Sequence, residues 1–442
     1  MSYLIDNEIE IAGRFVPADD LAERLLQHHK IDLVPAITIH KAYIHCTRCG
    51  SDCEKSAARI SDTIYYCFEC VNLGRLDSTM KLAAFPEINQ FKEIDFPLTW
   101  KGKLTELQQQ CSNQVVQAFK KQQDLLLWAV TGAGKTEISF AGIEWALQQQ
   151  LRVAIASPRV DVCVELFPRY QEAFQDTSMI LLHGKSTEKY QYRQLTICTT
   201  HQLLRFKQAF DILILDEVDA FPFANNPMLE MAAKRAVKVT GCRLLMTATP
   251  SKDLLQHYQT TYLPLRFHRH LLPQMKLHLC FNWNIKIYQG KLPAKFVRMV
   301  LQKIKMGQRF LIFVPRIKDL AVVDRVLSKK YQGKRCWETV YAGDEQRMEK
   351  VQMMRSEQVQ FLITTTILER GVTFPGIDVM ILGADERSFS VASLVQIAGR
   401  VGRKATRPFG NVDCFIGGYS KNVTLARQQI AEMNRRGRKI EG

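Results

Sequence analysis

The sequence lacks any apolar run long enough to cross a membrane. A spanning helix needs about 20 mostly apolar residues, whereas the apolar runs here are short pieces such as residues 125–130. The first residues, MSYLIDNEIEIAGRF, mix acidic side chains with apolar ones and lack the basic segment and apolar core of a signal peptide. We therefore expect a cytosolic protein that is not integral to a membrane.

The sequence also lacks the features of a disulfide framework. Of its 12 cysteines, five lie between Cys46 and Cys70, and the rest are scattered through apolar segments, as reduced intracellular thiols usually are. The scattered ones are Cys111, Cys163, Cys198, Cys242, Cys280, Cys336 and Cys414. Short repeats and low-complexity tracts are absent as well, so the composition is that of an ordinary globular protein.

Acidic residues are outnumbered by basic ones. The chain has 60 Lys and Arg against 44 Asp and Glu, which gives a net charge of +16 and a pI near 9.3. This excess favours a polyanionic partner, either nucleic acid or an anionic membrane face, and charge alone does not choose between them. The segment from Val401 onward carries nine basic and three acidic residues, and it fits a solvated helix and a DNA-contacting helix equally well.

From about residue 98 onward, short apolar runs alternate with longer amphipathic stretches. Buried strands are predicted at 125–130, 153–156, 195–198, 212–215, 244–246, 310–314, 340–342, 361–364 and 379–382. Helical spacing is found at 137–150, 293–306 and 317–330. This alternation is typical of βαβ units and parallel sheets, so the fold class predicted is α/β. An irregular stretch at 262–290 is the expected connection between two lobes.

The first 95 residues differ from the rest, with a weak helical pattern at 21–30 and five clustered cysteines. We expect a small metal-stapled module there. The predicted domains are therefore 1–95 for this module, 96–275 for the first lobe and 276–442 for the second.

A phosphate-binding loop is predicted between the strand at 125–130 and the helix that follows it. Glycines let backbone N–H groups wrap around phosphate oxygens, Lys135 can reach the β and γ phosphates, and Thr136 can hold Mg²⁺. Ala129 stands where the general pattern has its first glycine. The residues predicted to bind the nucleotide are Ala129, Val130, Thr131, Gly132, Ala133, Gly134, Lys135 and Thr136.

Paired carboxylates follow the apolar run at 212–215, where ligands collect at the carboxyl ends of parallel strands. Asp216 is predicted to bind Mg²⁺, and Glu217 to orient and deprotonate the attacking water. One helix before the phosphate loop, Gln108 is able to read the adenine edge.

Other strand ends carry hydroxyl or cationic groups suited to phosphate contacts. Pro158 and Arg159 end one strand, and Thr199 and His201 end another, so these four are predicted nucleic-acid contacts. Thr247–Thr249 follows a third strand and could link the ATP site to the nucleic-acid site. Each of these features taken alone is equally well explained as a turn or a cap.

Two motifs stand out in the second lobe. In the segment QIAGRVGR, Arg400 and Arg403 lie on one turn and can reach across a cleft to the γ phosphate, an effect worth roughly 10³ to 10⁵ in rate. Upstream, Thr364, Thr365 and Thr366 follow a strand and offer hydroxyls to a nucleic-acid backbone.

In this order and spacing, these segments resemble the successive motifs of superfamily 2 helicases over residues 100–420. The resemblance implies two tandem RecA-like P-loop lobes, a Walker B box at Asp216–Asp219 and arginine fingers at Arg400 and Arg403. It also places Gln396 at the nucleotide. DEAD-box RNA helicases have a histidine at that position, so DNA is favoured over RNA.

Cys46-Thr-Arg-Cys49 and Cys67-Phe-Glu-Cys70, separated by 17 residues, have the spacing of a zinc ribbon. Four thiolates suit tetrahedral Zn²⁺ and leave no open position, so the predicted site is structural. The same spacing could also hold rubredoxin-like iron. Cys53 is an extra thiol that could replace Cys49.

A four-cysteine module ahead of superfamily 2 lobes resembles the ComFA family of competence ATPases. The resemblance implies an ATP-driven motor that pulls single-stranded DNA through an uptake channel, with ATP, Mg²⁺ and Zn²⁺ as cofactors. It further implies a cytosolic position at the inner face of the membrane and contact with ComEC, ComFC and DprA. The sequence does not determine the direction of movement along DNA, whether a duplex is unwound, or the oligomeric state.

Three alternatives remain at this point. The replication-restart helicase PriA has zinc-binding cysteines and a similar sixth motif, although its cysteines lie between lobe motifs in a longer chain. The lobes could instead form an ATP-gated clamp that binds DNA without moving. A remodeller that acts on something other than DNA is the third.

Overall fold

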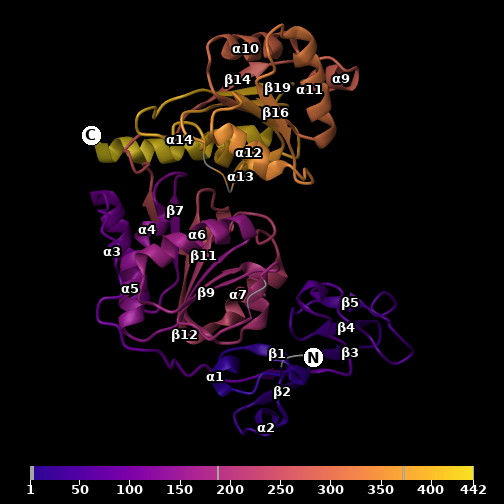
Figure 1. Ribbon diagram of the computed structural model, residues 1–442, viewed down its shortest axis with the longest axis vertical. Coiled ribbons are helices and arrows are strands. Elements are labelled where there is room, and N and C mark those ends of the chain that lie inside the picture. The colour runs from indigo at the N-terminus through magenta and orange to yellow at the C-terminus, as the bar shows by residue number, and fades with distance from the viewer. Residues whose placement is uncertain (1–3, 187–188, 371, 373, 442) are drawn as a thin grey trace. The chain divides into compact units, whose positions relative to one another are not determined.

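The computed structural model describes residues 4–186, 189–370, 372 and 374–441. The chain forms two compact units (Figure 1). The first contains the chain up to Leu127 together with Lys135–Tyr262, and the second contains Trp128–Gly134 together with the chain from Leu263 onward.

A seven-stranded sheet, with the strand order β13-β7-β12-β11-β8-β10-β9, forms the first lobe. Its strands are β7 Leu125–Ala129, β8 Val153–Ser157, β9 Met179–Leu182, β10 Leu195–Thr199, β11 Phe210–Asp216, β12 Val237–Thr247 and β13 Gln259–Leu263. Pairing is parallel from β12 to β9, and every residue of β7, β8 and β10 is buried. Strands buried on both faces read as continuous apolar runs, which is why the sequence marked them clearly.

The helices of this lobe follow the strands in alternation. They are α3 Glu106–Lys120, α4 Lys135–Ile138, α5 Phe140–Gln148, α6 Val160–Ala173, η3 Thr200–Arg205, α7 Pro227–Ala236 and α8 Lys252–His257. Helix α7 and η3 bury Leu203, Leu229 and Ala233 in one apolar cluster with Leu126, Leu213 and other strand residues, so both cover the same face of the sheet.

The N-terminal segment forms two small antiparallel sheets, β1-β6-β2 and β3-β4-β5. Its elements are α1 Glu8–Ile11, β1 Phe15–Pro17, η1 Ala18–Asp20, α2 Glu23–Leu26, β2 Asp32–Pro35, β3 Ile37–Ile39, β4 Tyr43–Cys46, β5 Asp52–Glu54, η2 Val71–Leu73 and β6 Lys81–Ala84. The buried cysteines of this segment share the apolar cluster that contains α7 and η3. The segment is therefore packed into the first lobe rather than tethered to it.

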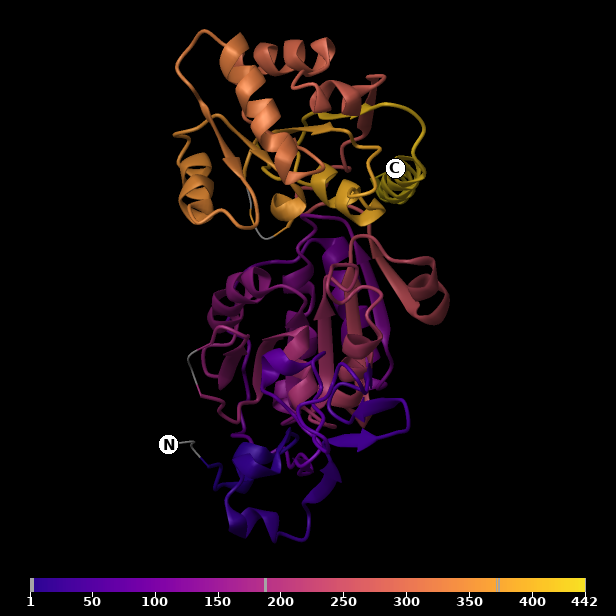
Figure 2. The same cartoon turned by 90° about the vertical axis from the view of Figure 1, so that its right-hand side faces the viewer.

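The second lobe is built on a six-stranded sheet, ordered β14-β19-β18-β15-β17-β16, in which every neighbouring pair is parallel. Its strands are β14 Met275–Leu279, β15 Phe310–Phe313, β16 Trp337–Val340, β17 Phe361–Thr364, β18 Asp378–Leu382 and β19 Val412–Ile416. Its helices are α9 Trp283–Tyr288, α10 Ala294–Lys305, α11 Ile317–Lys330, α12 Arg347–Arg355, η4 Thr366–Leu368, α13 Val391–Ala398 and α14 Lys421–Glu441. Figure 2 shows the C-terminal helix α14 end-on.

These observations confirm the predicted fold class of two parallel-sheet lobes preceded by a cysteine-rich segment. Three local predictions were wrong. Helix 137–150 is broken at Ser139 into α4 and α5, the weak helix at 21–30 shrinks to the four residues of α2, and strand 340–342 begins earlier, at Trp337. The predicted connection at 262–290 also contains β14 and α9, so its irregular part ends earlier than expected.

Among the described residues, no helix is both long enough and apolar enough to cross a membrane.

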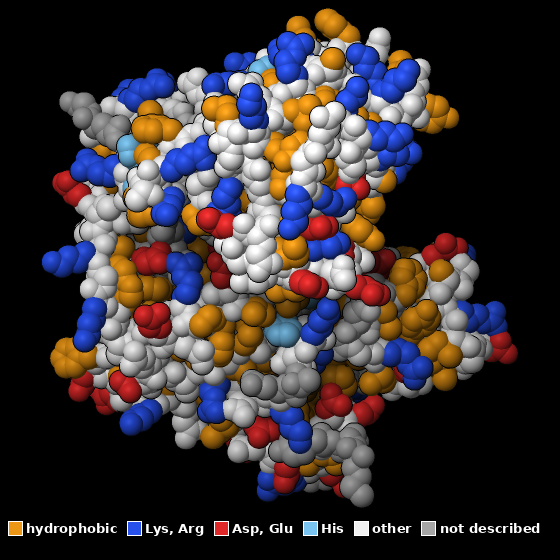
Figure 3. Space-filling view, turned by 45° about the horizontal axis from the view of Figure 1, so that its top comes forward, with side chains coloured by type: hydrophobic (Ala, Val, Ile, Leu, Met, Phe, Trp, Pro, Cys, Tyr) orange, Lys and Arg blue, Asp and Glu red, His pale blue; other side chains and the backbone are white. Residues whose placement is uncertain are grey.

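Lys and Arg side chains are spread over the face shown in Figure 3 instead of forming one patch. The net positive charge therefore does not by itself mark a binding path on that face.

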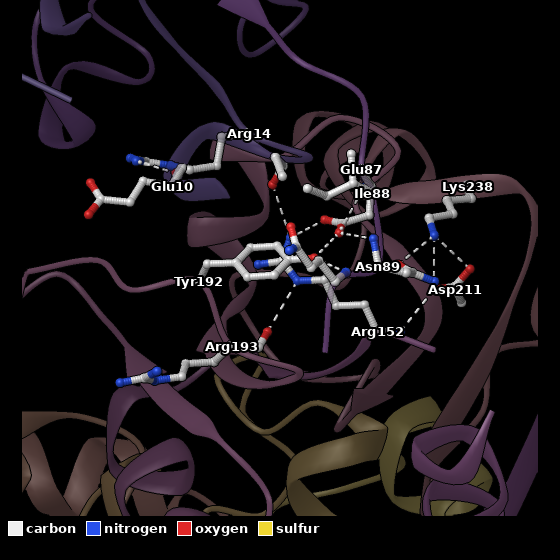
Figure 4. Close-up of polar contacts among 12 residues, drawn as sticks. Glu10, Arg14, Glu87, Ile88, Asn89, Arg152, Tyr192, Arg193, Asp211 and Lys238 are labelled. Atoms are coloured by element: carbon white, nitrogen blue, oxygen red, sulfur yellow. Dashed lines mark hydrogen bonds and ion pairs between the residues drawn. The ribbon is translucent and has the colours of Figure 1, made fainter. Parts of the chain in front are cut away.

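A buried charge network holds the N-terminal segment against the first lobe (Figure 4). Arg152, which immediately precedes β8, is fully buried and pairs with Glu87, whose side chain is 1% exposed. Arg152 also donates to the carbonyl oxygen of Ala12 at 3.1 Å and to the hydroxyl of Tyr190 at 2.7 Å. Breaking a buried pair leaves an uncompensated charge, so this contact is expected to matter for stability.

The substitution Glu87→Gln removes the charge that compensates Arg152. We expect the free energy of unfolding of the first unit to fall by about 3–5 kcal/mol, measured by urea denaturation followed by circular dichroism. The exposed Glu93→Gln is the matched control and should change it by less than about 0.5 kcal/mol. A similar small effect of both substitutions would contradict the proposed dependence of Arg152 on Glu87.

Candidate functional site

The loop between β7 and α4 has the backbone of a phosphate cradle. Gly132 and Gly134 both have φ of +78°, a conformation that glycine adopts without the strain caused by a Cβ atom. A Cβ built on Gly132 would have no described heavy atom within 4 Å, so the loop borders open space. Backbone N–H groups that surround such a space at a helix N-terminus favour an anion.

Lys135 and Asp216 are brought together although they lie 81 positions apart in the sequence. Lys135 begins α4 and Asp216 ends β11, and Lys135 Nζ lies 3.4 Å from Asp216 Oδ1. Their side chains are 17% and 11% exposed, and Thr136, beside Lys135, is 7% exposed. A cation, a carboxylate and a hydroxyl thus meet at the carboxyl edge of the sheet, where a nucleotide and Mg²⁺ could be held together.

The residues after β11 form a tight turn that connects two motifs. Glu217 has φ of +56°, and its backbone N–H donates to Asp216 Oδ1 at 2.9 Å. The Asp219 carboxylate accepts hydrogen bonds from the hydroxyls of Thr247 at 2.6 Å and Thr249 at 2.5 Å. Asp219 was not among the predicted catalytic residues, although its place as the fourth residue of the acidic box was a usable signal.

Gln108 has a structural contact that the sequence did not reveal. It is the third residue of α3 and forms a capping box with Thr105. The Thr105 N–H donates to Gln108 Oε1 at 2.8 Å, and Gln108 is 6% exposed. The capping contact holds the Gln108 side chain in place. That Gln108 reads the edge of adenine remains a prediction.

The predicted nucleic-acid contacts of the first lobe follow neighbouring strands. Strands β8 and β10 are parallel, with Ser157 beside Thr199, so Pro158 and Arg159 leave the sheet next to η3, which holds His201. Arg159 forms an ion pair with Asp161 at 3.4 Å. Burial lowers the pKa of His201, which leaves its imidazole neutral at pH 7.

The predicted contacts of the second lobe lie at the end of β17. Thr364 is its last residue and is fully buried, whereas Thr365 and Thr366 are half-buried where η4 begins. The Thr364 hydroxyl donates to the carbonyl of Thr365 at 3.2 Å. Thr365 and Thr366 are therefore more accessible to a ligand than Thr364 is.

Gln396 lies in the last turn of α13, and Arg400 and Arg403 lie in the loop that follows this helix. Gln396 is 4% exposed within the helix. Arg400 is 2% exposed and donates to the carbonyl of Val372, and half-buried Arg403 donates from Nε to the carbonyl of Gly399 at 3.3 Å. Both guanidinium groups are therefore held by the backbone of their own lobe.

The four predicted metal ligands form a buried cluster. The ligand atoms of Cys46, Cys49, Cys67 and Cys70 all lie within 4.8 Å of one another, and sulfur–sulfur distances within the cluster include 3.8, 3.5 and 3.7 Å. A tetrahedral ion with Zn–S bonds of about 2.3 Å requires sulfurs roughly 3.8 Å apart. The cluster therefore fits a four-coordinate metal ion, and Cys53 is outside it.

Arginines surround this cluster, and the sequence analysis did not identify them. Arg48, between the first two cysteines, is 2% exposed and donates to Cys70 Sγ from Nε at 3.3 Å and from Nη2 at 3.1 Å. From the first lobe, Arg205 donates to the carbonyl of Leu73 at 3.1 Å and Arg235 to that of Thr47 at 3.1 Å. Arg48 therefore contacts a cysteine sulfur directly, and Arg205 and Arg235 attach the segments beside the two cysteine pairs to the lobe.

Models of three known families match successive parts of the chain. Residues 6–84 match the competence protein ComFA N-terminal domain, residues 101–252 match the res subunit of type III restriction enzymes, and residues 291–405 match the helicase conserved C-terminal domain. The solved structure of S. cerevisiae Dbp5 bound to RNA and ADP BeF3 is 16% identical with a TM-score of 0.51, covering 75% of this chain and 92% of that one. That likeness is one of fold, and it agrees with the two parallel-sheet lobes.

Full-length similarity is found to two curated competence proteins. ComFA of Bacillus subtilis is 38% identical, covering 96% of this chain and 93% of the relative, and ComFA of Streptococcus pneumoniae is 37% identical, covering 97% and 98%. Helicase-type domains in this context support a DNA-dependent ATPase that uses ATP with Mg²⁺, in a helicase-like role in competence. The chain belongs to the ComFA family of competence proteins.

Proposed function

We propose that this protein is an ATP-driven motor that moves along single-stranded DNA and drives DNA uptake during natural transformation. The observation that carries the proposal is the contact between Lys135 and Asp216 beside the open phosphate loop, in a two-lobed chain of a competence family. A phosphate-binding loop paired with an acidic strand end is the arrangement that ATP hydrolysis requires.

In the proposed reaction, residues 129–136 hold the phosphates of ATP and Gln108 contacts its adenine. Mg²⁺ held by Thr136 and Asp216 would neutralise charge on the β and γ phosphates. Glu217 orients the attacking water and accepts its proton. Asp219 ties this turn to Thr247 and Thr249, so a movement of one segment is transmitted to the other.

Arg400 and Arg403 are proposed to stabilise the negative charge that spreads over the transferring phosphoryl group. Guanidinium groups suit this role because they stay charged and present several donors in a rigid plane. Gln396, one turn upstream, is proposed to face the same nucleotide.

Single-stranded DNA is proposed to bind at Pro158, Arg159, Thr199 and His201 in the first lobe and at residues 364–366 in the second. Hydroxyls and backbone N–H groups at strand ends grip phosphates without reading sequence. Alternate closing and opening of the lobes would then shift the protein along the strand.

The cysteine cluster is proposed to hold a structural Zn²⁺ ion at Cys46, Cys49, Cys67 and Cys70. All four positions of a tetrahedral ion are filled by thiolates, which leaves none for a substrate. The functional division proposed is 1–95 for this module and 96–275 and 276–442 for the two lobes. Membership of the family supports ComEC, ComFC and DprA as partners, at the inner face of the membrane.

The first prediction concerns ATP turnover. ATP hydrolysis should rise strongly with single-stranded DNA and much less with duplex DNA or RNA, and the rise should weaken steeply with salt because phosphate contacts release counterions. Lys135→Ala should lower turnover at least about a hundredfold by removing a cation from the transferring phosphate. The exposed Lys92→Ala is the control. Equal turnover in both variants, or no polymer effect, would contradict the proposal.

The second prediction separates a motor from a clamp. At equal nucleotide concentration, ATP turnover per bound protein should increase with the length of single-stranded DNA, because a motor leaves short strands sooner. A clamp would show turnover independent of length once the strand covers its site. Steady-state hydrolysis on a series of oligonucleotides measures this, and a flat series would contradict translocation.

The third prediction concerns the metal. Cys67→Ser should reduce bound zinc from one ion per chain to nearly none, measured by elemental analysis, and should lower the melting temperature of the first unit because the cysteines share its apolar cluster. Cys53→Ser is a matched control, since Cys53 is 2% exposed and lies outside the cluster. Full zinc content in Cys67→Ser would show that the cysteines do not form the site.

A further inference from the structure

The connector that leaves β13 contains a buried arginine outside every motif described above. Residues 264–270 read PLRFHRH and contain no helix or strand. Arg266 in this segment is 2% exposed, whereas Arg269, three residues later, is exposed. A buried charge is costly unless its hydrogen bonds are satisfied, so the partners of Arg266 indicate its role.

Those partners are the backbone carbonyls of the loop that carries Arg400 and Arg403. Arg266 donates from Nη1 to the carbonyl of Gly402 at 2.8 Å and from Nη2 to that of Gly399 at 3.4 Å. His268 Nε2 lies 2.9 Å from the same Gly402 oxygen. Two side chains of the connector therefore converge on one carbonyl between the two arginines.

This loop needs support because it follows the C-terminus of α13, where carbonyl groups lack helical partners. A guanidinium group at a helix C-terminus satisfies such carbonyls and interacts favourably with the helix dipole. Gly402 has φ of +73°, and a Cβ there would lie 2.1 Å from the carbonyl oxygen of Pro408. The loop is thus a tight turn in which small shifts would redirect Arg400 and Arg403.

The same connector is also bonded to the phosphate loop, which belongs to the same compact unit. The Val130 N–H donates to the carbonyl of Leu263 at 3.0 Å, and the Phe267 N–H donates to that of Gly132 at 3.1 Å. Within five residues, the connector therefore contacts both the loop proposed to hold ATP and the loop proposed to supply arginine fingers.

The positive charge of Arg266 also bears on its contacts with this loop. Burial, and secondly the nearby Arg403 cation, lowers the pKa of Arg266 to about 9, so Arg266 remains protonated at pH 7. Its donors are therefore all present under physiological conditions. An apolar side chain would fill the same space at lower desolvation cost, so packing alone does not account for an arginine here.

We propose that Arg266 and His268 are positioning residues that hold the loop 399–403 in the orientation in which Arg400 and Arg403 act on ATP. The connector thereby joins the position of the phosphate loop to that of the arginine fingers. This inference rests on the finger role given to Arg400 and Arg403 under the proposed function.

The test compares Arg266→Met with the exposed Arg269→Met in ATP hydrolysis at saturating single-stranded DNA. Misplacement of a catalytic group by about 1 Å can cost roughly a hundredfold, so we expect Arg266→Met to lower kcat at least about tenfold. KM and the dissociation constant of a fluorescent ATP analogue should change less than about twofold, because the ATP-binding loop is intact. Arg269→Met should leave all three quantities unchanged.

A double substitution separates positioning from a general loss of structure. If Arg266 acts through Arg403, Arg266→Met should have little further effect on kcat in an Arg403→Ala background. A full additional loss there, or unchanged kcat in Arg266→Met alone, would overturn the inference. Unchanged kcat in Arg403→Ala alone would instead contradict the proposed finger role, so the two failures are distinguishable.

His268 provides a second test that does not disturb the buried arginine. His268→Phe keeps an aromatic ring and removes the donor to Gly402, and we expect kcat to fall about fivefold. His268→Gln keeps a donor and should retain most of the activity. Equal activities of the two variants, each with a wild-type melting temperature, would show that the hydrogen bond does not position the loop.

Discussion

Parallel pairing of buried strands is the constraint on which the rest of this structure depends. Parallel strands point their carboxyl ends to the same edge of a sheet, so residues far apart in sequence meet there. Lys135 and Asp216 meet in this way at the first lobe, and Ser157 lies beside Thr199 for the same reason. At the second lobe, Thr364 ends β17 at the corresponding edge. The candidate site is thus a consequence of topology combined with polar residues at the ends of strands.

The sequence predicted the parts of this arrangement that depend on local pattern. Continuous apolar runs located most of the central strands, although β19 was missed because Asp413 interrupts its buried run. The cysteine spacing predicted the four residues of the buried cluster. Edge strand β14 was missed because only Met275 of its five residues is buried, with Lys276 and Leu277 exposed, so it does not read as a buried run. The contacts of Asp219 and Arg266 could not be predicted, since they depend on tertiary approach between segments that no spacing rule connects.

In both lobes, arginine side chains donate hydrogen bonds to irregular segments of the chain. Arg48, Arg205 and Arg235 donate to the sulfur atoms or carbonyls of the cysteine pairs, and Arg266 donates to the carbonyls of the loop after α13. In each case a buried or half-buried guanidinium group donates to groups that regular secondary structure leaves without partners. Several donors in one rigid plane make arginine better suited to this task than lysine.

The shared apolar cluster of the cysteine segment and α7 has a consequence for synthesis of the chain. Residues up to 84 cannot complete their core until Ala236 has left the ribosome. At about 5–20 residues per second, that delay lasts roughly 8–30 seconds. During this interval the segment can form its own apolar cluster, which includes Ile11, Leu21 and Phe85, whereas the cluster that contains the cysteines is incomplete. The four thiols lie within 25 residues of one another, so the zinc ion proposed for them would order the cysteine pairs before their apolar partners in α7 are made, and metal supply would then influence how much of the newly made chain reaches its folded state.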